Sequence, residues 1–145
     1  MTRCRAQETQ AVKPRKSVLI VSERKNFRHS LGRLLLLDGH MVQGTKGPLY
    51  ALDVVRHRQL DLVATDIVLS NIDGIELIAN ARDLQENVQI VAFSDGCGQR
   101  ERRALQKMDV CRCIRDLVSV EQAGEEIEAA ILGREMVRPN TRRPL

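Results

Sequence analysis

The sequence predicts an α/β fold in which a five-stranded parallel sheet carries helices on both faces. Five short apolar runs, rich in Val, Ile and Leu, predict buried strands, and the segments between them place apolar residues at helical spacing. Such alternation indicates a doubly wound sheet, with ligands expected at the carboxyl ends of the strands. A chain of 145 residues that is 43% hydrophobic fits one domain with a real core.

The expected elements follow one another without an internal repeat. The predicted strands cover 17–21, 41–43, 60–65, 88–93 and 110–114. The predicted helices cover 25–38, Pro48 to about Arg58, a segment capped by Asp73, about 100–107, and a last segment from Ser119 to about 132.

Local signals support these helices. Pro48 suits a first helical position because its missing N–H needs no partner there. Asp73 can accept a hydrogen bond from an unpaired N–H of the next turn. Ser119 and Gln122 have the spacing of a capping box, and Ile127 and Ile131 then face inward.

Charge is unevenly distributed along the chain. Residues 1–16 hold five basic and one acidic residue, and 133–145 hold four and one, whereas 17–132 carries net −3. We therefore expect one folded domain at 17–132 between basic, solvated tails at 1–16 and 133–145.

Several classes of function are disfavoured. The scarcity of aromatic residues, 2%, argues against a module that stacks on bases, and the thirteen residues after 132 are too few for a helix-turn-helix unit. Sequence-specific DNA binding is therefore not expected. No signal peptide or membrane span is evident, so we expect a cytoplasmic protein.

Polar residues gather where the predicted strands end. Ser22 and Glu23 follow the first strand, Asp66 the third, Ser94 the fourth and Arg115 the fifth. One crevice would then hold two carboxylates, two hydroxyls and a cation. Carboxylates are ligands that Mg²⁺ prefers, and a carboxylate can attack a phosphoryl donor to form an acyl phosphate.

The segments VLIVSE, DLVATDIVLSNIDGIELI, IVAFS and CIRD resemble the receiver domain of bacterial response regulators, over about 17–132. The resemblance implies a (βα)5, flavodoxin-like fold. It implies that Asp66 is the phospho-acceptor and that Glu23 and the Val68 carbonyl bind Mg²⁺ together with Asp66. It also implies that Ser94 turns toward the phosphate and that Arg115 occupies the place of an invariable lysine.

The sequence also departs from the family pattern. Ser22 replaces an acidic metal ligand, so that it contributes at most a hydroxyl and Mg²⁺ binding is expected to be weak. Arg115 keeps the charge of the lysine but not its shape, and Asp116 replaces the following proline. Asp95 would repel a phosphoryl group, and Arg112 stands where the family has a switch aromatic.

Two functions therefore remain open. The first is a stand-alone receiver, phosphorylated on Asp66 by a histidine kinase or phosphotransfer protein, that signals through a protein partner. A homodimer through the 100–107, 110–114 and 119–132 face is compatible with it. The second is a pseudo-receiver that binds partners without phosphorylation. An enzyme is not expected, since a phosphatase of this topology would need an acid where Val68 stands.

Overall fold

The computed structural model describes residues 15–69, 74–94, 98–108, 110, 112–114 and 119–133. The strands are β1 (Ser17–Val21), β2 (Met41–Thr45), β3 (Leu62–Asp66), β4 (Gln89–Phe93) and β5 (Arg112–Ile114). The helices are α2 (Lys25–Leu37), α3 (Pro48–His57), α4 (Gly74–Leu84), α5 (Gln99–Lys107) and α6 (Val120–Gly133).

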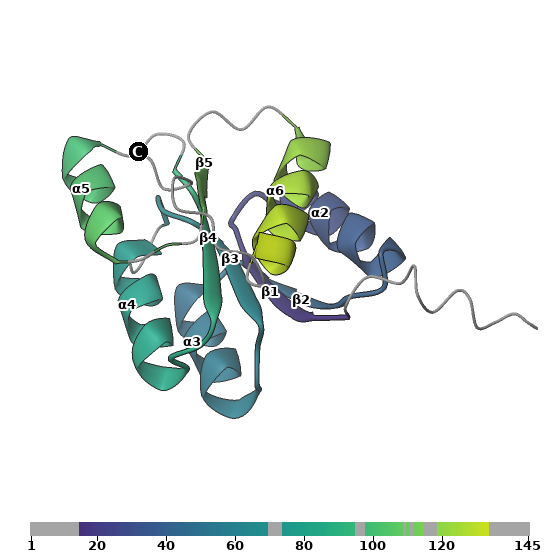
Figure 1. Ribbon diagram of the computed structural model, residues 1–145, viewed down its shortest axis with the longest axis horizontal. Helices are drawn as coiled ribbons and strands as arrows, with labels where there is room; N and C mark the ends of the chain where they lie inside the picture. Colours follow the sequence, from purple (N-terminus) through teal and green to yellow (C-terminus); the bar gives the residue numbers. More distant parts are fainter. Residues whose placement is uncertain are drawn as a thin grey trace, which may run out of the picture.

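The five strands form one parallel sheet in the order β2-β1-β3-β4-β5. Helices α2 and α6 cover one face of the sheet, and α3, α4 and α5 cover the other (Figure 1). This is the doubly wound α/β fold that the sequence predicts. The order of the strands reverses at β1, which has β2 on one side and β3 on the other, and ligand crevices of such sheets open at this point.

The core consists of two apolar layers, one on each face of the sheet. Alternate residues of a strand point to opposite faces, so Leu19 and Val21 pack under α3 and α4, whereas Val18 and Ile20 pack under α2 and α6. All four are at most 1% exposed. The near-continuous apolar strands of the sequence are explained by burial on both faces.

Local sequence signals set several boundaries as expected. Pro48 occupies the start of α3. The backbone N–H of Gln122 donates to the Ser119 hydroxyl at 3.0 Å, which is the predicted cap of α6. Gly39 ends the turn after α2 at φ 97°, a conformation that favours glycine. Ile127 and Ile131 are buried as predicted.

Other boundaries differ from those predicted. β2 extends beyond the predicted end at Gln43 to Thr45, because Gly44 and Thr45 pair with β1 despite the low strand propensity of glycine. β3 begins at Leu62 and includes Asp66, which the pattern places just after the strand. The predicted cap Asp73 and most of both tails lie outside the described residues. Among the helices that the structure describes, none is long and apolar enough to cross a membrane; the cytoplasmic location stays a prediction.

Candidate functional site

The register of the sheet brings Ser22 beside Asp66. Val21 of β1 pairs with Thr65 of β3, so the next residue of each strand lies at the carboxyl edge. The Ser22 hydroxyl donates to Asp66 Oδ2 at 2.6 Å. Both residues are buried, Ser22 at 0% and Asp66 at 7% exposure. Asp66 therefore lies at the switch point of the sheet, in the position where the sequence predicts the site.

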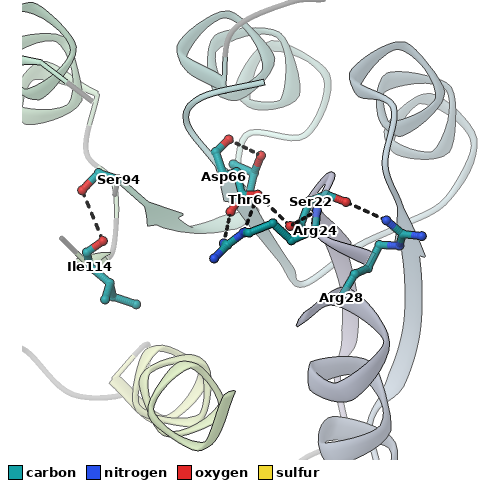
Figure 2. A network of polar contacts seen from close by, with 7 residues as sticks. All are labelled: Ser22, Arg24, Arg28, Thr65, Asp66, Ser94 and Ile114. Carbon is teal, nitrogen blue, oxygen red and sulfur yellow. Dashed lines mark hydrogen bonds and ion pairs between the residues drawn. The ribbon is translucent and has the colours of Figure 1, made fainter. Parts of the chain in front are cut away.

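The Asp66 carboxylate forms an ion pair with Arg24, the last residue before α2. Arg24 Nη2 donates to Asp66 Oδ1 at 2.6 Å, and Arg24 Nε approaches Oδ2 at 3.4 Å (Figure 2). Removing a carboxylate from water is costly unless it is paired and hydrogen-bonded. Both oxygens have such a partner here, so the buried charge is compensated within the chain itself.

Two aromatic rings support the Arg24 guanidinium. Its Cζ lies 4.2 Å from the ring centroid of Phe27, within the range of a cation–π contact. Phe27 packs edge-to-face against Phe93, with centroids 5.4 Å apart. Phe93 in turn pairs with Asp66 in the sheet. These are the two phenylalanines of the whole chain; Phe27 contacts the cation directly, and Phe93 contacts Phe27.

Backbone contacts fix the edge around Asp66. The Thr65 hydroxyl donates to the Asp66 carbonyl at 2.9 Å, and Arg28 Nη1 donates to the Ser22 carbonyl at 2.8 Å. The Gly74 N–H, at the start of α4, donates to the Ile67 carbonyl at 2.8 Å. A side chain at Gly74 would collide with this backbone. The turn from β3 into α4 is thereby held tightly against the site.

Ser94 lies at the end of β4, buried at 3% exposure. Its hydroxyl donates to the Ile114 carbonyl at 3.2 Å and accepts a contact from Cys113 Sγ at 3.3 Å. Figure 2 shows this hydroxyl turned toward Ile114, away from the Asp66 cluster. In this conformation Ser94 links β4 to β5, and contact with a phosphoryl group on Asp66 would require it to rotate.

The other predicted site residues fall into two groups. Glu23 and Val68 are exposed, next to the buried Ser22 and close to Asp66 in the chain. Asp95, Arg115 and Asp116 lie outside the described residues, so the predicted cation at the end of strand five stays a prediction.

Arg112, at the position of the family's switch aromatic, pairs with Glu126 of α6. Arg112 Nε and Glu126 Oε1 are 3.3 Å apart, and the two side chains are 25% and 31% exposed. An ion pair thus joins β5 to α6 at the position where the resemblance to receiver domains predicts the switch aromatic.

The observed arrangement does not fit a divalent cation on Asp66. Among the described residues, no group of three or more His, Cys, Asp and Glu side chains could hold a metal ion. The oxygens that would face the metal are engaged by Ser22 and Arg24. A divalent ion needs oxygen ligands and is repelled by a guanidinium, so it can reach Asp66 only if Arg24 moves away.

Arg24 is the residue at the candidate site that sequence reasoning missed. The sequence signal is the run Ser22-Glu23-Arg24 at the end of a strand, but the family pattern involves only its first two positions. Arg24 is two residues beyond Ser22, close enough in the chain for its long side chain to reach the same edge of the sheet. That spacing was the available clue.

Comparisons with known proteins agree with the fold. The model of the response regulator receiver domain family matches residues 18–123. Sporulation initiation phosphotransferase F of Bacillus subtilis is 28% identical over 77 residues, which is 53% of this chain and 62% of that protein. Response regulator MprA of Mycobacterium sp. (strain KMS) is 26% identical over 87 residues, 60% of this chain and 38% of that protein.

The fold also matches solved structures. A CheY-like response regulator receiver domain protein from Methanospirillum hungatei JF-1 superimposes with a TM-score of 0.78 at 19% identity, covering 84% of this chain and 98% of that one. The family match over residues 18–123 defines a receiver-type signalling domain. The chain belongs to the response regulator receiver domain family of two-component systems. Its matches span less than two thirds of the curated relatives above.

Proposed function

We propose that this protein is a receiver whose Asp66 accepts a phosphoryl group from a histidine kinase or phosphotransfer protein. One observation carries the proposal: Asp66 is a buried, fully partnered carboxylate at the carboxyl edge of β3, beside the point where the strand order reverses. Such a charge is expensive to bury, so its retention favours a functional role over a structural one.

The chemical step needs little beyond a positioned carboxylate. An Asp66 oxygen attacks the phosphorus of the donor, and an O–P bond forms while the bond from phosphorus to the donor's leaving atom breaks. The leaving group departs with that electron pair. A cation beside the carboxylate lowers the repulsion between two anions as they approach. Arg24 is placed to supply such a charge.

The domain, proposed to cover 17–132, would act as a signalling module rather than as an enzyme. Its output would pass to a protein partner, or to a second copy of the chain, through the face formed by α5, β5 and α6. Sequence-specific DNA binding is not part of the proposal. Mg²⁺ binding through Glu23, Asp66 and the Val68 carbonyl would be weak, because Ser22 brings no charge.

A pseudo-receiver is the second candidate, and one contact favours it. Arg112 is tied to Glu126 of α6, so β5 has no ring that could follow the Ser94 hydroxyl when the site changes. In this alternative the α5–β5–α6 face would bind a partner constitutively, and Asp66 would serve to stabilise the fold.

Intact-protein mass spectrometry distinguishes the two candidates. The protein is incubated with acetyl phosphate, with and without Mg²⁺, and its mass is compared with that of the Asp66→Asn variant. The receiver assignment predicts one phosphoryl adduct on the parent protein and none on the variant. Asp83→Asn is a matched control, since Asp83 is an exposed acid on α4. It should be labelled like the parent.

Absence of an adduct on the parent under both conditions, with the fold intact, would contradict the receiver assignment and favour the pseudo-receiver. An adduct that persists in Asp66→Asn would show that the acceptor is another residue.

A further inference from the structure

We propose that Arg24 is a resident counter-ion of Asp66, which occupies the place where a divalent cation would otherwise bind and competes with that cation for the same carboxylate oxygens. This inference rests on the assignment of Asp66 as the reactive residue. It concerns how the site is charged, and its central test does not require phosphorylation.

Both oxygens of the Asp66 carboxylate already have partners within the chain. The described partners of Asp66 are the Ser22 hydroxyl on Oδ2 and the Arg24 guanidinium, which lies 2.6 Å from Oδ1 and 3.4 Å from Oδ2. A metal ion on Asp66 would need at least one of these two oxygens, beside the Arg24 guanidinium. Two cations cannot share that position, because their repulsion in a partly buried site is strong.

Contacts with Phe27 and Ser22 restrain Arg24. Arg24 is 45% exposed, and a long side chain at such a position ordinarily samples many rotamers. Here the face of Phe27 lies against it, and Phe93 packs edge-to-face against Phe27. The backbone N–H of Arg24 also donates to the Ser22 hydroxyl at 3.2 Å. The cation is therefore held in place before any ligand arrives.

The charge of the site supports the same inference. Ser22 stands where the family has an acid. The buried part of the site therefore holds one carboxylate, that of Asp66, whereas an acid at position 22 would give a divalent ion two. A single positive charge neutralises a single carboxylate, and a guanidinium can bind carboxylate and phosphoryl oxygens side by side. The loss of the acid at Ser22 and the presence of Arg24 thus compensate each other.

Mg²⁺ titration of the protein, followed by amide shifts of Asp66 and Ile67 in ¹H–¹⁵N spectra, tests the competition. The parent should bind weakly, and Arg24→Gln should bind Mg²⁺ about tenfold more tightly, since a charge-assisted contact to a carboxylate is lost. Phe27→Leu leaves the cation but removes the ring that holds it, so we expect a smaller gain in affinity.

Lys25→Gln is the matched control. It removes the same charge one residue along the chain, from an exposed side chain that is not among the described partners of Asp66. It should leave the Mg²⁺ affinity at the parent value, and Asp66→Asn should abolish binding in the Arg24→Gln background.

A second readout follows the consequence for phosphorylation. In EDTA, acetyl phosphate should label the parent faster than Arg24→Gln, whereas excess Mg²⁺ should restore labelling of the variant. Equal Mg²⁺ affinities of the parent, Arg24→Gln and Lys25→Gln would overturn the inference, whether or not Asp66 is phosphorylated. Conversely, a tenfold gain in Arg24→Gln without any labelling would uphold the competition and contradict only the receiver assignment.

Discussion

The start of α4 lies directly on the backbone that carries the acceptor: a Cβ atom on Gly74 would fall 2.6 Å from the Cα of Ile67, the residue after Asp66. The same Cβ would meet the Asp66 carbonyl. No rotamer relieves a contact with backbone, so only glycine fits where α4 approaches β3.

Gly74→Ala should therefore destabilise the protein. Either α4 or the end of β3 must shift, and the cost should be about 1–3 kcal/mol of unfolding free energy, as for overpacked cores. Urea denaturation followed by circular dichroism measures it. Gly32→Ala is the control. Gly32 lies inside α2, and a Cβ there would be 3.7 Å from Cγ1 of Val42 in β2, which is an ordinary van der Waals contact. That variant should gain about 0.5–1 kcal/mol. Equal effects of both variants would show that α4 does not press on Ile67.

A second carboxylate can be introduced at Ser22. Ser22→Asp replaces a hydroxyl that lies 2.6 Å from Asp66 Oδ2 with a like charge in a fully buried position, so the variant should be less stable without Mg²⁺. Mg²⁺ should now bind the paired acids. At a hundredfold excess over its dissociation constant it should restore about 2.7 kcal/mol of stability.

Thermal melts with and without Mg²⁺ measure this linkage. Ser22→Ala is the matched control, because it also loses the hydroxyl but gains no ligand, so its melting temperature should not respond to Mg²⁺. If the melting temperature of Ser22→Asp were the same with and without Mg²⁺, position 22 would lie outside any metal site.

The acyl phosphate on Asp66, if formed as proposed, should be long-lived. Val68 is 58% exposed, two residues after Asp66, and its aliphatic side chain cannot orient a water for attack on the phosphorus. Val68→Asn supplies a carboxamide there and should speed hydrolysis by about tenfold through better positioning of water. The decay of the phosphorylated mass after removal of acetyl phosphate gives the rate. The acyl phosphate of Val68→Leu should decay at the rate of the parent. If that of Val68→Asn also decayed at the parent rate, the side chain at position 68 would not control the attack of water.

Much of the fold follows from sequence patterns because the patterns describe burial. The run LVATD of β3 is buried at every position, and the Ser119 cap sets the start of α6 with one local hydrogen bond. The extension of β2 through Gly44 and Thr45 could not be predicted, because the ladder with β1 determines it rather than the propensity of Gly44.

The site was predictable in part for the same reason. Strand ends fix where Ser22, Asp66 and Ser94 lie. They do not fix the direction of a side chain: the Ser94 hydroxyl points to Ile114, and Arg24 reaches Asp66 with its guanidinium over the ring of Phe27. Contacts of long side chains depend on tertiary packing that spacing along the chain does not encode.

Borohydride reduction of the phosphorylated protein, followed by peptide mass spectrometry, tests the phospho-acceptor assignment most directly. An acyl phosphate is reduced to an alcohol, so phosphorylated Asp66 would become homoserine at position 66 and nowhere else. The account predicts that product after acetyl phosphate treatment and its absence from untreated protein. Homoserine at another aspartate, or an unreduced Asp66 in protein that carries the phosphoryl adduct, would contradict it.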